Sequence, residues 1–382
     1  MKQTGSVIAV LGVFLFAQSA LADWTPVKRL TWTSGMSFGP AGAIDSTDAI
    51  HVVWYDTTPG NYAVYYRRST DGGATWSALK RLTWASGDAV CPSIAADSND
   101  DLHLVWQDAT SGNDEIYYRK STDAGASWSA AKRLTWTSGN SWEPLLAIDS
   151  ANAIHVVWYD DTPGNLEVYY RGSADGGETW GSTKRLTWNS SRSESPVIAI
   201  DGADAVHVAW YDNMPGHGEI YYKRSTDGGT TWSSMRRLTW LSYCAFPSIA
   251  ADSGTSVHLA WAVEAAAGME IYYKRSTDSG ATWSASKRLV GNPGGSSAPA
   301  LAVASMDNPH IVWMDYSPND PEIYYKKSAD GGSTWGADKR LTWSEGNSYD
   351  PALAIDSAGF VHVFWRDDIA TNIEVYYRKG KE

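Results

Sequence analysis

Two of the places where an aromatic side chain stands directly beside a carboxylate suit the recognition of sugars. Trp142 precedes Glu143, and Tyr349 precedes Asp350. A tryptophan or tyrosine ring offers a broad apolar face with a polar edge, while a carboxylate accepts hydrogen bonds from hydroxyl groups. Tyr243 is a third aromatic candidate. These residues predict a surface that binds carbohydrate.

Two carboxylates about 5–10 Å apart would instead support glycoside hydrolysis. Glu143, Asp160 and Asp350 are candidates for such a pair, although their spacing in the sequence selects no two of them. Two arginines, Arg192 and Arg366, stand out because nearly every other arginine occupies a repeated position. The remaining charged candidates for ligand contact are Asp161 and Glu194. Binding and catalysis therefore both stay open.

Histidines and aspartates also recur, which raises the question of a metal ion. Seven of the eight histidines begin an apolar run that ends in tryptophan, at His51, His103, His155, His207, His258, His310 and His362. Equivalent positions of a repeat lie far apart, whereas one metal ion needs its ligands about 2 Å away, so we expect a hydrogen bond repeated in each unit. The aspartates that follow these runs predict turn caps or calcium ligands, and calcium is the one cofactor left open.

A phrase that returns about every 52 residues determines where these side chains lie. Arg-Leu-Thr-Trp, or a close variant, has its leucine at Leu30, Leu82, Leu134, Leu186, Leu238, Leu289 and Leu341. A period near this length, made of short strands, is typical of a β-propeller. In one unit we expect strands at 144–149, 154–159, 167–171 and 184–187, because these runs are rich in β-branched and aromatic residues.

The number of copies predicts the number of blades. The run that ends in His-Val-Val-Trp or a close variant occurs seven times, as does the Tyr-Tyr run, and no fourth-strand run follows Tyr376 and Tyr377. Residues 27–31 are a spare fourth strand near the other end of the chain. We therefore expect an all-β propeller of seven four-stranded antiparallel blades, closed by this N-terminal strand, which removes open sheet edges.

A second motif, Ser-x-Asp-x-Gly-x-Thr-Trp, follows the third strand in six units, with Ser127 in place of the threonine in one of them. It resembles the Asp-box (BNR) repeat of sialidase-like propellers and covers nearly the whole chain. Its aspartates are Asp71, Asp123, Asp175, Asp227, Asp278 and Asp330. We expect them to stabilise turns, because aspartate accepts hydrogen bonds from turn amides and glycine adopts positive φ. Catalytic sialidases also carry an Arg-Ile-Pro motif, and no such motif occurs here, so no catalytic residue is transferred from that family.

Comparison of the repeats points to one face of the ring. The Asp-box turns are nearly uniform, whereas the four residues that precede the first-strand proline differ in every unit, at 36–39, 88–91, 140–143, 192–195, 243–246, 295–298 and 347–350. We expect these residues to surround the mouth of the central tunnel. The tryptophans and tyrosines of the repeated motifs we expect in the core rather than at a ligand site.

The chain's ends and composition predict its compartment. Residues 1–22 read as a signal peptide with an Ala-Leu-Ala cleavage site, which leaves 23–382 as one domain, secreted or periplasmic. No segment is apolar and long enough for membrane insertion. A net charge of −12 argues against a nucleic-acid partner. The two cysteines, Cys91 and Cys244, could pair in an exported protein.

These observations together predict an exported, non-enzymatic propeller that binds a glycan or an extracellular surface protein through the loops around its tunnel. Two alternatives remain, a glycoside hydrolase that uses carboxylates of the same face and a protein-binding scaffold without affinity for sugars.

Overall fold

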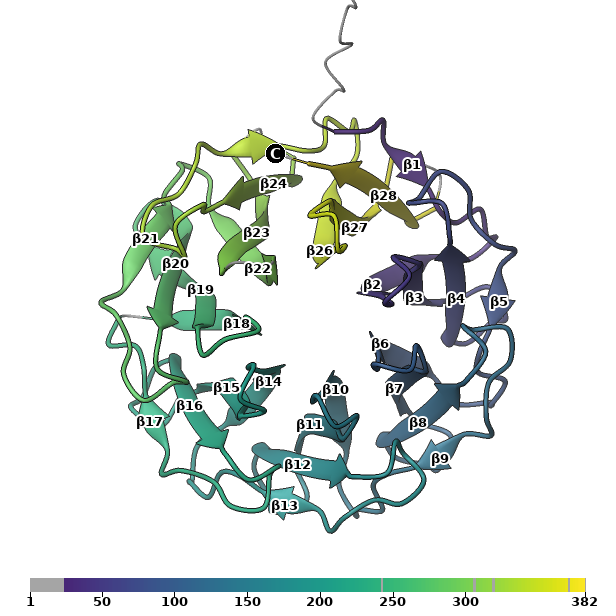
Figure 1. Cartoon of the computed structure of the whole chain (residues 1–382), viewed down its shortest axis with the longest axis horizontal. Coiled ribbons are helices and arrows are strands. Elements are labelled where there is room, and N and C mark those ends of the chain that lie inside the picture. The colour runs from purple at the N-terminus through teal and green to yellow at the C-terminus, as the bar shows by residue number, and fades with distance from the viewer. Residues whose placement is uncertain (1–23, 242, 305–306, 318–319, 370–371, 382) are drawn as a thin grey trace, which may run out of the picture.

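Seven four-stranded antiparallel sheets form a closed ring in the computed structural model (Figure 1). The expected all-β, seven-bladed propeller is therefore confirmed, and the part of the chain that the structure describes contains no helix that could cross a bilayer. The structure describes residues 24–241, 243–304, 307–317, 320–369 and 372–381. The expected signal peptide lies outside these residues.

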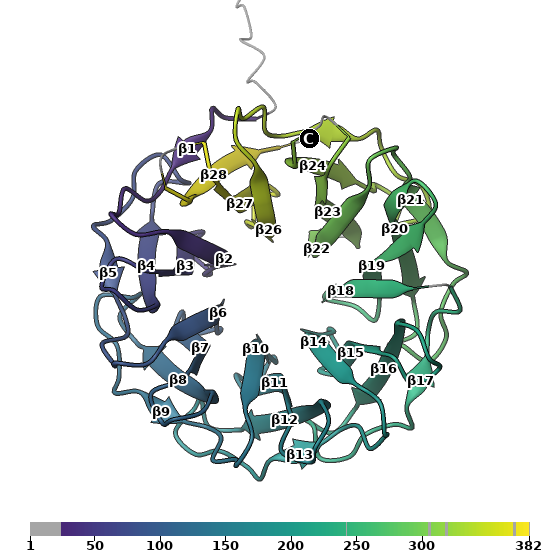
Figure 2. The ribbon, with the colours of Figure 1, turned by 180° about the vertical axis from the view of Figure 1, so that it is seen from behind.

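Each blade places its strands in order from the tunnel to the rim (Figures 1 and 2). The first strands, nearest the axis, are β2 (Ser37–Ile44), β6 (Ala89–Ala96), β10 (Ser141–Ile148), β14 (Ser193–Ile200), β18 (Cys244–Ala251), β22 (Ser296–Ala304) and β26 (Ser348–Ile355). The second strands are β3 (Ile50–Asp56), β7 (Leu102–Asp108), β11 (Ile154–Asp160), β15 (Val206–Asp212), β19 (Val257–Ala265), β23 (Asn308–Asp315) and β27 (Val361–Asp367).

The two outer strands of each blade follow the Tyr-Tyr and Lys-Arg runs of the sequence. The third strands are β4 (Ala63–Ser69), β8 (Glu115–Ser121), β12 (Glu167–Ser173), β16 (Glu219–Ser225), β20 (Gly268–Ser276), β24 (Glu322–Lys327) and β28 (Glu374–Gly380). The fourth strands are β5 (Lys80–Arg81), β9 (Lys132–Arg133), β13 (Lys184–Arg185), β17 (Arg236–Arg237), β21 (Lys287–Val290), β25 (Lys339–Arg340) and β1 (Lys28–Arg29).

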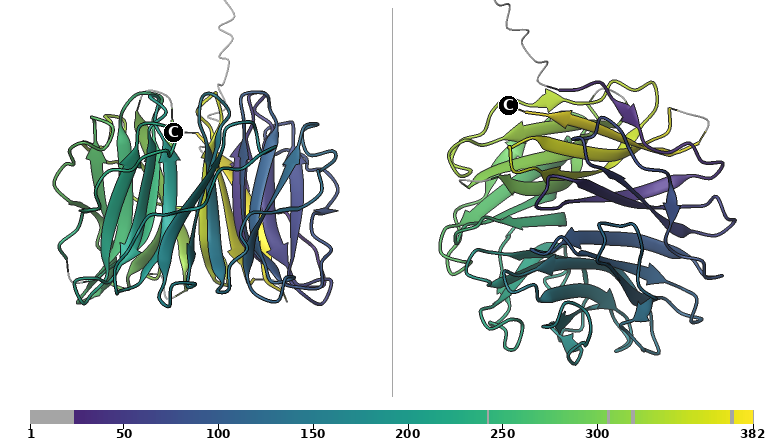
Figure 3. Two further views of the ribbon diagram at one scale, coloured as in Figure 1. Left: turned by 90° about the horizontal axis from the view of Figure 1, so that it is seen from below. Right: turned by 45° about the vertical axis from the view of Figure 1, so that its right-hand side comes forward.

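The N-terminal strand closes the ring, as expected. β1 pairs antiparallel with β28, with Lys28 opposite Tyr377 and Arg29 opposite Tyr376, so the last blade contains β26, β27, β28 and β1. This pairing joins residues more than 340 positions apart in the sequence. The side views show that the blades stand upright around the axis, with loops gathered at two opposite ends (Figure 3).

The core lies between neighbouring blades, because the second strands are buried on both faces. Val157 and Tyr170 of the third blade, for example, pack against Val206, Val208 and Trp210 of the fourth. All seven second-strand tryptophans are at most 1% exposed. This burial explains why these strands read as continuous apolar runs rather than as alternating patterns.

The ring of histidines forms hydrogen bonds, and each of the seven contacts the second tyrosine of its own blade. His51 Nδ1 lies 2.8 Å from Tyr66 Oη, and His51 Nε2 lies 3.0 Å from Asp45 Oδ2. Tyr66 in turn donates to the backbone carbonyl of Ala124 in the next blade. The predicted structural role is confirmed, since the histidine fixes the tyrosine that links two blades.

The Asp-box turns occupy the outer ends of the third strands. Asp175 Oδ1 accepts hydrogen bonds from Ser173 Oγ and the Thr179 amide, and its Oδ2 accepts one from Thr179 Oγ1. These bonds lower the pKa of Asp175 to about 2. The box tryptophan packs on the neighbouring blade, as Trp180 does against Tyr118 with ring centroids 5.1 Å apart.

The tryptophans of the Arg-Leu-Thr-Trp phrase are not in the core, and this expectation was wrong. Six of them are 63–67% exposed at the outer rim, namely Trp32, Trp84, Trp136, Trp188, Trp240 and Trp343. The preceding leucine takes the buried position instead, as Leu134 does at 1% exposure. The fourth strand ends at Arg133, and in the segment that follows Leu134 and Thr135 are buried while Trp136 lies on the surface.

Candidate ligand site at the mouth of the central tunnel

Every first strand contains a bulge at its proline, and the bulge directs one residue toward the axis. In β10, Trp142 pairs with Tyr159, and the register then shifts so that Leu145 pairs with Val157. Glu143 lies within this bulge with a φ of 49°. Proline has no amide to donate to a partner strand, so a bulge absorbs it without breaking the sheet.

The same backbone conformation returns in all seven blades, although each blade carries a different side chain there. The bulge residues, with φ between 48° and 52°, are Gly39, Cys91, Glu143, Ser195, Phe246, Ala298 and Asp350. Six of the seven are not glycine, and positive φ is uncommon for such residues. Strained backbone of this kind is often found at functional sites.

The bulge residues converge on a pocket of about 410 Å³ at the axis. Six of them line it with the seven prolines that follow, and Leu145 and Val197 complete its wall. The variable residues predicted to surround the tunnel therefore do meet there. The volume falls within the range of about 300–1,000 Å³ that is usual for ligand pockets.

Two carboxylates from different blades, Glu143 and Asp350, line this pocket. Enclosure by the surrounding protein raises the pKa of Glu143, although a hydrogen bond from Ser195 Oγ to its Oε2, 3.3 Å long, partly offsets this. Asp350 Oδ2 accepts a hydrogen bond from Arg366 Nε at 2.5 Å. The pocket thus offers one carboxyl group with a raised pKa and one that is ion-paired.

A cluster of aromatic rings lies beside the pocket, without lining it, at the junction of the last and first blades. The Arg366 guanidinium lies 4.6 Å from the ring centroid of Tyr349 and 5.4 Å from that of Phe38. Phe38 also stacks on Tyr55 at 5.6 Å. Arg366 is therefore fixed between two rings and a carboxylate, in a geometry that suits a polar ligand with apolar faces.

A second aromatic corner belongs to the third blade and contains the predicted Trp142. Its ring lies 5.5 Å from that of Tyr159, and its Nε1 donates a hydrogen bond to Asp114 Oδ2 at 3.0 Å. The Tyr159 hydroxyl contacts the Glu143 carboxyl group. Trp142 and Glu143 therefore belong to one cluster, which also contains two residues that were not predicted.

The other predicted residues around the mouth form two smaller contacts. Arg192 Nη2 donates to Glu194 Oε2 at 2.6 Å, and the Arg192 side chain is 59% exposed. The Tyr243 ring lies 6.0 Å from that of Tyr211. Like Trp142, Tyr349 and Arg366, these residues stand around the pocket without lining it.

Asp160 and Asp161 do not reach the pocket and serve the turns of their blade. Asp160 is 1% exposed, accepts from Ser141 Oγ at 2.7 Å and caps the amide of Thr162. Asp161 Oδ1 accepts from the amide of Asn140 at 2.7 Å. The equivalents of Asp160 in other blades cap their turns in the same way, as Asp56 does, which supports the turn-cap interpretation of these acids.

The second strands contribute residues that were not singled out from the sequence. The position after each second-strand tryptophan pairs across the sheet with the residue before the bulge, at Tyr55, Gln107, Tyr159, Tyr211, Ala262, Met314 and Arg366. Only Arg366 was predicted. The residue type differs among blades here too, so the comparison of repeats would have found this position if it had included the second strands.

The cysteines do not form the disulfide that the sequence left open. Both are free thiols. Cys91 lines the pocket, while Cys244 is buried with its Sγ 3.6 Å from Glu219 Oε2. Burial raises the pKa of each thiol to about 12. Among the described residues, no group of three or more His, Cys, Asp or Glu side chains is arranged to hold a metal ion.

Comparison with known proteins supports the repeat assignment and the fold. The model of a BNR repeat-containing family member matches residues 40–187, which confirms the expected resemblance over that part of the chain. No curated protein matches the sequence.

Solved structures share the propeller at low sequence identity. A protein of unknown function from Dyadobacter fermentans is 11% identical, with a TM-score of 0.60 over 92% of this chain and 98% of that one. The α-L-arabinanase of Penicillium chrysogenum, complexed with arabinobiose, is 15% identical, with a TM-score of 0.54 over 92% and 98%. The Hadza microbial sialidase Hz136 is 14% identical, with a TM-score of 0.57 over 91% of this chain and 66% of that one. Identities this low establish the fold alone.

Proposed function

We propose that this protein is an exported, non-enzymatic propeller that binds carbohydrate at the mouth of its central tunnel. The observation that carries the proposal is the pocket of about 410 Å³, where one repeated backbone presents seven different side chains. The pocket carboxylates Glu143 and Asp350 each follow a half-buried aromatic residue that stands beside the pocket, Trp142 and Tyr349 respectively. Sugar hydroxyl groups would bond to the acids while sugar rings stack on the aromatics.

The structural relatives are consistent with this proposal. Two of the proteins that share the fold are named as a sialidase and an arabinanase, and the second was solved with arabinobiose bound. The asymmetry of the pocket favours one ligand on the axis over seven equivalent ligands. No sialidase mechanism is transferred, because the Arg-Ile-Pro motif is absent from the sequence.

A glycan array tests the proposal directly. Labelled protein comprising residues 23–382 should bind a related set of sugars in a dose-dependent manner. Trp142→Ala and Tyr349→Ala should each weaken binding at least about tenfold, because each removes a stacking surface worth about 1.4 kcal/mol or more. Trp188→Ala, which removes an exposed tryptophan of the outer rim, is the matched control and should leave binding unchanged.

The array should be run with and without calcium, since the acidic loops were also considered as calcium ligands. The Asp160 oxygens already accept hydrogen bonds, so we expect binding that does not depend on calcium. A blank array in both conditions would contradict the carbohydrate proposal and favour a protein-binding scaffold. Full binding by both mouth variants would place the sugar site elsewhere.

A glycoside hydrolase is the second candidate, and one observation favours it. The raised pKa of Glu143 is the property that a general acid needs, and Asp350 supplies a second carboxylate in the same pocket. If a sugar identified on the array is cleaved, Glu143→Gln should abolish turnover while it preserves binding. If the bound sugar is recovered intact, the non-enzymatic proposal stands.

A further inference from the structure

The outer rim carries six exposed tryptophans, and the surroundings of one differ from those of the others. Each projects from the end of a fourth strand toward basic side chains. The Arg133 and Arg171 guanidinium carbons lie 5.9 and 5.8 Å from the Trp136 ring centroid. Among the described residues, Trp84 has one such cationic neighbour, Arg119, whose guanidinium carbon lies 5.4 Å from the Trp84 ring centroid. Arg81 occupies the same sequence position as Arg133 but makes no such contact.

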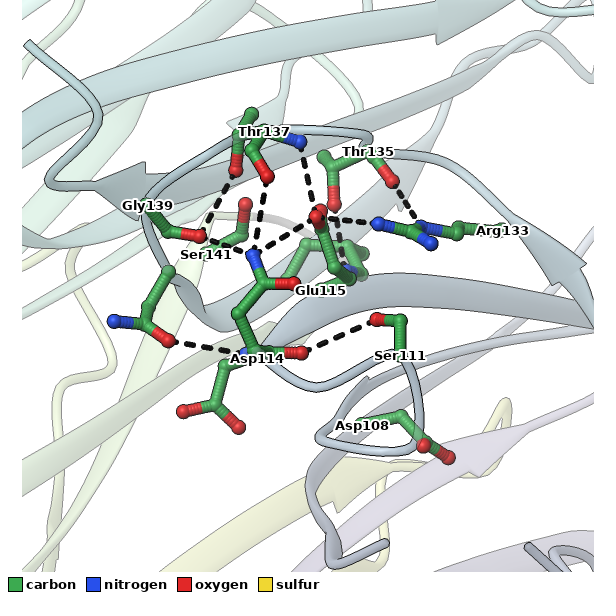
Figure 4. Close-up of polar contacts among 12 residues, drawn as sticks. Asp108, Ser111, Asp114, Glu115, Arg133, Thr135, Thr137, Gly139 and Ser141 are labelled. Atoms are coloured by element: carbon green, nitrogen blue, oxygen red, sulfur yellow. Dashed lines mark hydrogen bonds and ion pairs between the residues drawn. The ribbon is translucent and has the colours of Figure 1, made fainter.

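The reason lies at the start of the third strand. In six blades this strand begins near a poorly exposed glutamate that binds the fourth-strand arginine, the six being Glu115, Glu167, Glu219, Glu270, Glu322 and Glu374. Figure 4 shows this arrangement in the second blade, where Arg133 Nη2 lies 2.6 Å from Glu115 Oε1. The first blade has Ala63 at this position, 1% exposed.

Arg81 therefore has no carboxylate partner among the described residues. Its Nε donates to the backbone carbonyl of Thr83, an interaction that Arg133 also makes with Thr135. The Nη groups, which bind glutamate in other blades, make no hydrogen bond within the described part of the chain. A guanidinium group with unused planar donors favours a carboxylate from outside the protein.

A second guanidinium group with unused donors lies beside it. Arg171 and Arg378, the equivalents of Arg119 in other blades, donate to the carbonyls of Leu134 and Leu341. Arg119 makes no hydrogen bond to the described residues, and its buried Nε has no partner. Because Nε itself is buried, a ligand in the pocket would bond to the Nη groups of Arg119, which have no hydrogen-bond partner among the described residues.

Arg81, Trp84 and Arg119 share one pocket of about 400 Å³ between the first two blades, with Ser127 and Ser129 on its wall. The Trp84 side chain is 63% exposed, so much of its ring surface is open to a ligand. The site thus combines the guanidinium groups of Arg81 and Arg119 with the apolar face of the Trp84 ring.

We propose that this pocket, which we call the Trp84 seam, binds an acidic glycan. The carboxylate of a uronic-acid residue accepts hydrogen bonds from Arg81 and Arg119, and the apolar face of the sugar ring lies against Trp84. The proposal does not depend on what binds at the tunnel mouth, since the two pockets share no residue.

Calorimetric titration with oligogalacturonate tests the Trp84 seam, and the fully methyl-esterified oligomer is the neutral control. The wild-type protein should bind the acid at physiological salt and fail to bind the ester. Trp84→Ala should reduce the affinity at least about tenfold, whereas the matched Trp136→Ala should change it less than twofold. Ala63→Glu should also reduce it at least about tenfold, because the new carboxylate occupies Arg81.

Ala63→Glu restores a residue that six blades already accommodate, so an unchanged melting temperature should show that the variant folds. The proposal would be overturned by no binding to the acid, by equal binding of the ester, or by full affinity in Ala63→Glu. Equal competition by dextran sulfate would reduce the Trp84 seam to a general anion site and contradict carboxylate recognition. Loss of binding in Trp142→Ala, with retention in Ala63→Glu, would move the acidic glycan to the tunnel mouth.

Discussion

The Asp-box turns and the bulges at the tunnel mouth belong to the same repeat, but they tolerate different side chains. Six Asp-box turns have nearly the same residues and the same hydrogen bonds. Seven bulges have nearly the same φ and seven different residues. In the Asp box, side-chain hydrogen bonds stabilise the turn. In the bulge, backbone pairing of the first and second strands stabilises the conformation.

This difference separates stability from recognition within one blade. Six of the seven bulge residues line the tunnel pocket, so their side chains are in a position to contact a ligand. An Asp-box residue contacts its own turn or the next blade, so a change there disturbs the ring. Pockets of about 440 and 480 Å³ on the Asp-box side are lined by repeated residues such as Tyr170, Trp180 and Trp128, and size alone therefore does not identify a site.

The largest effect that tests this comparison is expected at a glycine of the Asp box. An alanine Cβ at Gly125 would lie 2.0 Å from Tyr66 Oη, and the φ of this residue is 83°. Tyr66 is buried and bound to His51, so it cannot yield without breaking the link between two blades. We expect Gly125→Ala to lower the free energy of unfolding by roughly 2–4 kcal/mol, measured by chemical denaturation.

Gly112→Ala is the matched control, because its φ is 100° and nothing lies within 4 Å of the added Cβ. This variant isolates the cost of positive φ, which is about 1 kcal/mol. Equal losses in the two variants would mean that the Tyr66 contact contributes little to stability.

The histidines that hold these tyrosines predict a pH dependence of intermediate size. Burial lowers the pKa of five of them, to about 4 for His362. An unfolded histidine titrates near 6.5, so the unfolded chain binds more protons than the folded chain between these values. Stability is therefore fully present above pH 6.5 and declines as the pH falls toward 4.

Calorimetric melting between pH 8 and pH 4 should show this decline as a falling melting temperature. His217→Asn should retain the pH profile, because this histidine lies outside the ring of blade histidines, in a loop with its side chain 42% exposed, and an asparagine amide can also donate a hydrogen bond, as the His217 Nε2 contact to Glu219 Oε1 at 3.0 Å requires. A melting temperature that stays constant from pH 7 to pH 4.5 would contradict a structural role for neutral histidines in the blades.

The sequence was sufficient to predict the propeller, because repetition reveals the strands, their number and the closing strand at once. It also indicated the tunnel mouth, since unlike residues at one position of a repeat are visible without coordinates. It did not reveal that Tyr55 packs against Phe38, or that Tyr159 packs against Trp142, because these contacts depend on the cross-strand register at the bulge. It also placed Trp84 in the core, although the chain has left the fourth strand there and buries Leu82 and Thr83 instead.

The smallest expected effect is a gain in stability at the tunnel mouth. Ala298 has a φ of 48° in the bulge of its blade and lines the pocket, and a residue without a Cβ adopts this region at little cost. We expect Ala298→Gly to raise the free energy of unfolding by roughly 0.5–1 kcal/mol, a balance between relieved strain and a more flexible unfolded chain. Ala209→Gly, in a buried second strand, should instead lower it by at least about 1 kcal/mol. Chemical denaturation would measure both variants. Changes of opposite sign in the free energy of unfolding are expected if strand pairing stabilises the bulge backbone. A loss of stability in both variants would show that the bulge residues stabilise the ring as the Asp-box residues do.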